Sequence, residues 1–153
     1  MQNYHEKLGQ AVSQFHTLEF LLRNFLFIKS NHQNTNSKLP IDLYKLNPGE
    51  STPVTEFTNY DTSQKLIHKT NVIFTNCNLP PFDTSIVDIR DAVAHGRVAT
   101  LRKTSDRFLL KFENPKKETH VKLSHKFELT ESFFNSINKK LKDYINILSE
   151  VSV

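Results

Sequence analysis

Residues 83–101 read DTSIVDIRDAVAHGRVATL, and the spacing of the apolar residues changes within this stretch. In its first part they recur at steps of three and four residues, which places them on one side of a helix: Ile86, Ile89, Ala92 and Val93. Asp83 or Thr84 is suited to cap the start of that helix. Gly96 is well placed to end it in a left-handed cap. From Val98 onward the apolar residues alternate, so the stretch predicts a helix that leads into a β-strand.

Three further stretches show the helical period. Apolar residues recur at three- and four-residue steps within residues 5–29, 61–76 and 130–150. An Asp or Thr side chain at the start of the second and third of these stretches can cap the first turn. The segment between the first two helices, residues 30–60, is polar and is interrupted by prolines and by Pro48-Gly49. It predicts a long connection without a core of its own.

Short stretches of alternating polar and apolar residues follow the third helix. They predict strands at residues 98–101, 108–112 and 121–123, separated by turn-forming residues. We therefore expect a β insertion at about residues 98–124. The predicted fold class is mainly α, a bundle of about four helices with a small antiparallel β-hairpin or meander inserted before the last helix. Residues 1–153 have the length of one domain.

The composition is that of a globular protein, with 37% hydrophobic and 24% charged residues. Phenylalanine occurs 12 times and tryptophan is absent, which predicts a core rich in phenylalanine. A single cysteine, Cys77, cannot form an internal disulfide, and the first residues lack the layout of a signal peptide. No apolar run approaches the roughly 18 residues of a membrane span, so we expect no membrane association and a cytoplasmic location.

The positive charge is concentrated in the second part of the chain. Residues 90–153 hold 13 Lys and Arg against 8 Asp and Glu, whereas residues 1–89 hold 7 against 8. A basic half suits a phosphate-rich partner. It equally suits a lysine-rich surface in contact with water, so charge alone does not identify a partner.

The polar residues of the predicted third helix have a notable spacing. Arg90 is followed directly by Asp91 and, after four intervening residues, by His95. This pattern resembles the signature of HEPN domains, which is an arginine, an adjacent polar residue, and a histidine after four to six intervening residues. The ending Ala94-His95-Gly96 is also similar to that of many bacterial HEPN proteins.

The resemblance implies a HEPN-like helical bundle and a function. It implies a metal-independent endoribonuclease of the toxin or antiviral-defence kind, which acts on RNA as a homodimer and has an antitoxin or a sensor protein as a candidate partner. Arg90 and His95 would be catalytic and Asp91 would support them, with no cofactor and no metal. Glu19 and Arg23 resemble a Glu/Arg pair that many HEPN proteins carry on their first helix.

The chemistry of the motif suits RNA cleavage without a metal ion. Attack of the ribose 2′-OH on its phosphate needs an acid or base that titrates near neutral pH and a fixed cation for the phosphate charge. His95 and Arg90 supply these two groups. Asp91 would orient His95 or hold Arg90. Three basic residues further along the chain are candidates for contacts with RNA: Arg97, Lys116 and Lys117.

Arg90 and His95 lie five positions apart, which is about 140° around an ideal helix. One regular helix therefore does not bring both to one phosphate. Either the end of the helix turns His95 toward the arginine, or two copies of the chain face each other across a symmetric interface.

The same residues also fit functions without catalysis. Asp91 and His95 are four positions apart and could form an ordinary polar network at a helix end, and the Glu/Arg pair of the first helix has the same spacing. The protein would then be a non-catalytic HEPN module that binds RNA or a protein partner, or a dimeric scaffold. His120 and His125 match no zinc-site spacing and are expected at the surface.

Overall fold

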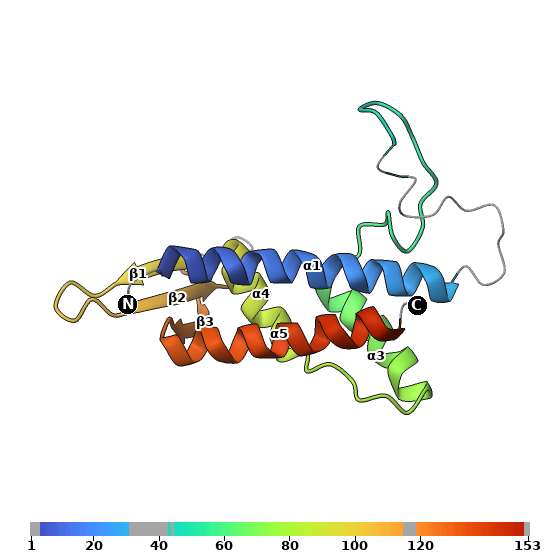
Figure 1. Ribbon diagram of the computed structural model, residues 1–153. Coiled ribbons are helices and arrows are strands. Elements are labelled where there is room, and N and C mark those ends of the chain that lie inside the picture. Colours follow the sequence, from blue (N-terminus) through green and yellow to red (C-terminus); the bar gives the residue numbers. More distant parts are fainter. Residues whose placement is uncertain (1–3, 31–42, 44, 115–118, 152–153) are drawn as a thin grey trace. The chain divides into compact units, whose positions relative to one another are not determined.

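The computed structural model of the chain describes residues 4–30, 43, 45–114 and 119–151. Within these residues it has four α-helices and one three-stranded antiparallel sheet (Figure 1). The elements follow one another as α1 (Tyr4–Ser30), α3 (Ser63–Asn76), α4 (Ser85–His95), β1 (Arg97–Thr100), β2 (Arg107–Phe112), β3 (Leu123–Glu128) and α5 (Glu131–Val151). The prediction of a mainly α fold with a small antiparallel sheet before the last helix is confirmed.

The helices begin beside the side chains predicted to cap them. The hydroxyl groups of Thr62 and Thr130 accept hydrogen bonds from backbone N–H groups in the first turns of α3 and α5. At the start of α4, Thr84 occupies the cap position without a side-chain bond. Asp83 Oδ1 instead accepts a hydrogen bond from the backbone N–H of Ser85 at 2.9 Å. Of the two residues proposed from the sequence, Asp83 therefore supplies the side-chain bond at the start of α4.

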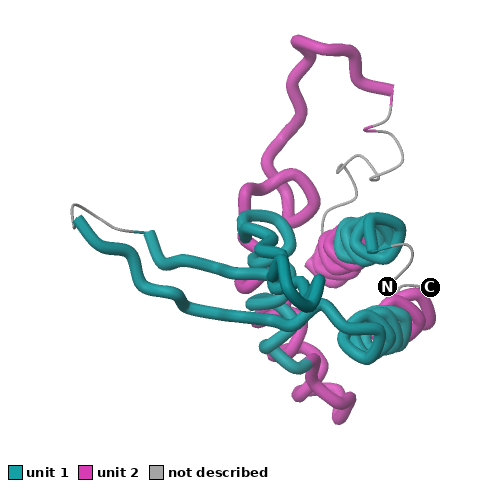
Figure 2. The backbone as a smooth tube through the Cα atoms, turned by 90° about the vertical axis from the view of Figure 1, so that its left-hand side faces the viewer, with its two compact units in different colours: residues 1–16, 83–143 teal, residues 17–82, 144–153 magenta. Residues whose placement is uncertain are grey.

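The chain divides into two compact units, each made of two segments (Figure 2). Unit 1 combines residues 1–16 with residues 83–143, so it holds the start of α1, the whole of α4, the sheet and the first part of α5. Unit 2 combines residues 17–82 with residues 144–153 and holds the rest of α1, α3 and the end of α5. The motif of α4 belongs to unit 1.

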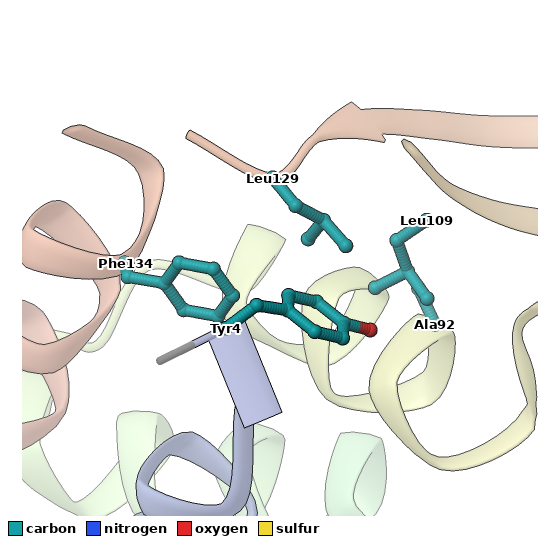
Figure 3. Close-up of a cluster of buried hydrophobic side chains, with 5 residues drawn as sticks. All are labelled: Tyr4, Ala92, Leu109, Leu129 and Phe134. Atoms are coloured by element: carbon teal, nitrogen blue, oxygen red, sulfur yellow. The ribbon is translucent and has the colours of Figure 1, made fainter. Parts of the chain in front are cut away.

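The core of unit 1 joins α1, α4, β2 and α5 around one cluster of buried side chains (Figure 3). Its members are Tyr4, Ala92, Leu109, Leu129 and Phe134. The small side chain of Ala92 is completely buried, which lets α4 approach β2 closely. This contact fixes one side of α4 against the sheet.

The sheet is a simple meander in the order β1-β2-β3. Its third strand differs from the prediction, because β3 runs from Leu123 to Glu128 instead of ending near residue 124. The register explains the difference, since Leu109 of β2 stands opposite Phe127 of β3 and two large apolar side chains meet on the core side. Val121, which was predicted in the strand, is exposed and precedes it.

The core of unit 2 is built from aromatic rings, as the phenylalanine content predicted. The ring centres of Phe25 and Phe74 are 5.5 Å apart, those of Phe74 and Phe82 are 5.1 Å apart, and Phe82 stacks on Tyr144 at 4.2 Å. The side-chain amide of Asn71 accepts from the backbone N–H of Phe82 at 2.7 Å and donates to its carbonyl at 2.9 Å. These bonds hold the segment after α3 against the helix.

Gly96 ends α4, but the predicted left-handed cap is wrong. Its backbone is extended, with φ −75° and ψ 174°, a conformation that any residue can adopt. The glycine is required by space, because an added Cβ would lie 2.3 Å from the carbonyl oxygen of Ala92 and 3.0 Å from that of Leu110. Glycine is therefore needed at this position because the end of α4 approaches β2 closely, and not because of a special backbone angle.

Candidate functional site

Two carboxylates on α4 tie this helix to the sheet. Lys111 Nζ of β2 lies 3.1 Å from Asp91 Oδ2, and His125 Nε2 of β3 lies 3.7 Å from Asp88 Oδ2. Lys111 and His125 are direct partners in the β2–β3 register, so the two carboxylates, three positions apart on α4, meet neighbouring strands on one face of the sheet. The polar side of α4 is thereby held in a fixed position.

Arg90 joins this network through Asp91. Arg90 Nη1 lies 3.2 Å from Asp91 Oδ1, so one carboxylate is shared by the guanidinium of Arg90 and the ammonium of Lys111. The side chain of Arg90 keeps 31% of its surface exposed. Asp91 was predicted either to orient His95 or to hold Arg90. Its contacts match the second role. Among the described residues, Asp91 makes no contact with His95.

His95 is the last residue of α4 and its side chain is exposed. Within the described part of the chain, its imidazole makes no hydrogen bond and no ion pair. α4 stays helical through this residue, so the helix end does not turn His95 back toward Arg90. Five positions on a regular helix leave the two groups about 140° apart, on different sides of it.

Arg97 does not join this cluster. Arg97 stands on the sheet face opposite that of Lys111, with its guanidinium carbon 5.5 Å from the centre of the Phe112 ring. Lys116 and Lys117 lie outside the described residues. The predicted contacts of all three with RNA stay predictions.

Glu19 and Arg23 belong to unit 2, whereas the Arg90–His95 motif belongs to unit 1. Arg23 is almost buried and donates to Glu19 Oε1 at 3.1 Å, to the backbone carbonyl of Asn59 at 2.9 Å and to that of Asp61 at 2.8 Å. These contacts hold the end of the long connection against α1. The pair thus has a structural task within its own unit.

Two residues of the network were not found from the sequence. His125 was expected at the surface, but its ring is half-buried and stacks on Phe127 at 5.8 Å, and its Nδ1 is buried with no hydrogen-bond partner among the described residues. His120 is exposed, as expected. Lys111 lies two positions after Leu109 in β2, and this spacing places both side chains on the same face of the strand. Its partner on α4 depended on the register and could not be read from the pattern.

Comparisons with known proteins gave no relative. No family model matches the sequence, and no significant match was found among curated proteins or among solved structures. In the described ranges, no group of three or more His, Cys, Asp and Glu side chains is placed to hold a metal ion. No helix in these ranges is long and apolar enough to cross a membrane.

Proposed function

We propose that the protein is a metal-independent endoribonuclease of the HEPN-like toxin or antiviral-defence kind and that it acts as a homodimer. One observation carries the proposal, the polar end of α4. There the Arg90 guanidinium is held by Asp91 and partly exposed, and the exposed imidazole of His95 has no polar partner among the described residues. A held cation and an accessible side chain that can take up and release a proton are what 2′-OH attack on a phosphate requires.

Each residue has a defined task in this reaction. Arg90 binds the phosphate oxygens through its donor fork, and Asp91 keeps that fork in place. Lys111, bound to the same carboxylate, adds positive charge beside it. The 2′-oxygen forms a bond to phosphorus while the bond from phosphorus to the 5′-oxygen breaks, and His95 carries the proton between the two oxygens. The products are a 2′,3′-cyclic phosphate and a 5′-OH end.

The position of the two groups on α4 supports the proposed dimer. One helix presents Arg90 and His95 on different sides, so a single copy does not direct both to one phosphate. A symmetric interface can place Arg90 of one copy beside His95 of the second, and the symmetry then produces two such sites.

Cleavage of total RNA in the presence of EDTA tests the proposal. We expect the wild type to produce cyclic phosphate and 5′-OH ends. His95→Ala should lose at least about 100-fold in rate, the usual contribution of a general acid or base. His120→Ala is the matched control, because it also removes an exposed imidazole but leaves α4 intact. A strict magnesium requirement, or full activity of folded His95→Ala, would overturn the mechanism.

A non-catalytic module is the second candidate, and one observation favours it. Asp88 and Asp91 tie α4 to the sheet, so the polar residues of this helix have a structural task even without catalysis. RNA affinity that survives His95→Ala, with no cleavage by either protein, would support an RNA-binding module. Loss of dimerisation in Arg90→Ala, with no RNA affinity in the wild type, would instead support a scaffold.

A further inference from the structure

The face of the sheet that points away from α4 has an aromatic row with a cation on each side. Phe108, Leu110 and Phe112 alternate along β2 and are half-buried, opposite in direction to Leu109 and Lys111. β2 is the central strand of the sheet (Figure 1). This row therefore runs along the middle of the sheet. Large apolar side chains therefore stay partly accessible on a surface formed by three strands.

Two cations flank this row symmetrically. Arg97 of β1 and Lys126 of β3 both stand directly opposite Leu110. Each leans over a different ring of the row, since the Arg97 guanidinium carbon lies 5.5 Å from the centre of Phe112 and Lys126 Nζ lies 4.3 Å from the centre of Phe108. Neighbouring strands are about 4.8 Å apart, so the backbone positions of Arg97 and Lys126 lie about 10 Å from each other across the row.

The stretch of sequence from β1 to β3 has a strong excess of positive charge. Residues 97–128 hold nine Lys and Arg against four Asp and Glu, a net charge of +5, while the rest of the chain has a net charge of −1. Among the described strand residues on this face, Glu128 is the one carboxylate, and it stands opposite Phe108. A polyanion with flat apolar groups would match both the charge and the rings.

We propose that this face binds single-stranded nucleic acid, with bases stacked on Phe108 and Phe112 and phosphates bound by Arg97 and Lys126. Unpaired bases stack on exposed aromatic rings, and cations beside the rings follow the phosphate backbone. The two cations that cover the rings in the free protein move to the phosphates when bases take their place. This surface lies on the other side of the sheet from Asp91, so binding here is separate from the chemistry proposed at α4.

Fluorescence anisotropy with a labelled 12-nucleotide oligouridine RNA tests the inference. The His95→Ala protein is used throughout, so that the probe stays intact whatever the outcome of the cleavage assay. We expect binding that weakens about fivefold or more in Phe108→Leu and in Phe112→Leu, which keep an apolar side chain but remove the ring. Phe127→Leu is the matched control, because it makes the same change on the opposite face and should leave the affinity unchanged.

Charge variants keep the test decisive if a phenylalanine variant fails to fold. Arg97 and Lys126 are exposed, and each change to Gln should lower the slope of log Kd against log salt by about 0.7. Glu128→Gln should tighten binding, because it removes the negative charge on this face. A DNA oligomer of the same base sequence tests whether this face distinguishes RNA from DNA. Equal affinity means that bases and phosphates are bound without the 2′-OH, and tighter binding of RNA means that the 2′-OH is also contacted.

The negative outcomes are equally distinct. Oligomer binding that is unchanged in folded Phe108→Leu and Phe112→Leu would overturn base stacking, and so would salt slopes that are unchanged in both cation variants. No binding by the His95→Ala protein at low salt would overturn the inference altogether. Binding without any cleavage by the wild type would leave this inference standing and count against the ribonuclease.

Discussion

Gly96→Ala should destabilise the protein strongly although its backbone angles suit alanine. The added Cβ would lie 2.3 Å from the carbonyl oxygen of Ala92, about 1 Å inside the closest ordinary contact between carbon and oxygen. That oxygen also accepts the last backbone hydrogen bond of α4, from Gly96 N at 2.6 Å. The clash therefore cannot be relieved by rotating a side chain, and the end of α4 must move away from β2.

The cost can be worked out from these contacts. Overpacking costs about 1–3 kcal/mol and the lost hydrogen bond about 1 kcal/mol. The lower freedom of alanine in the unfolded chain returns about 0.4–1 kcal/mol. We expect a net loss of about 1–3.5 kcal/mol in the free energy of unfolding. For a chain of this length that lowers Tm by about 2–14 °C.

Urea unfolding followed by circular dichroism measures this loss, and Gly9→Ala is the matched control. Gly9 lies within α1, where an added Cβ meets nothing within 4 Å. The same substitution there should stabilise the helix by about 0.5–1 kcal/mol, so the two variants should differ in sign. Gly96→Asn distinguishes a steric cause from a conformational one. A left-handed cap would tolerate asparagine, whereas a clash of the added Cβ predicts that asparagine destabilises the protein as alanine does. A Gly96→Ala protein as stable as the wild type would refute the packing argument.

Three further predictions concern the site, the acid stability and unit 2. A 1:1 mixture of inactive Arg90→Ala and His95→Ala should regain about a quarter of the wild-type cleavage rate, because half of the dimers are mixed and each holds one intact composite site; a mixture that stays inactive would exclude such a site. The Lys140 ammonium, 2.7 Å away, and the bonds from Ser85 hold the pKa of Asp83 at about 2. This lowered pKa stabilises the fold above about pH 4 and the contribution is lost as the pH falls toward 2, so the stability deficit of Asp83→Asn, followed by urea unfolding, should shrink over that range. Arg23→Lys keeps the charge but not the donor fork, so it should lower the free energy of unfolding by about 1–3 kcal/mol and should not change RNA cleavage by folded protein.

The elements of the fold could be predicted because their signals are local. The three- and four-residue spacing of apolar side chains located α1, α3, α4 and α5 to within a few residues, and Thr62 and Thr130 marked two of their starts. The alternation of polar and apolar residues after Gly96 predicted the strands of the sheet. The placement of Arg90 and His95 on one helix, about 140° apart, also followed from the sequence because α4 is regular.

Only the tertiary structure decided what these residues meet. The register of β2 with β3 placed Lys111 and His125 under α4 and moved the third strand to Leu123–Glu128. The same register put Arg97 and Lys126 on either side of Leu110. These pairings join residues far apart in the chain, and a shift of one position would exchange the two faces of a strand without changing its local pattern. The sequence by itself therefore determined which segments are helix or strand and which groups could act on a phosphate, whereas packing alone decided which charges face each other, because those contacts are set by long-range register.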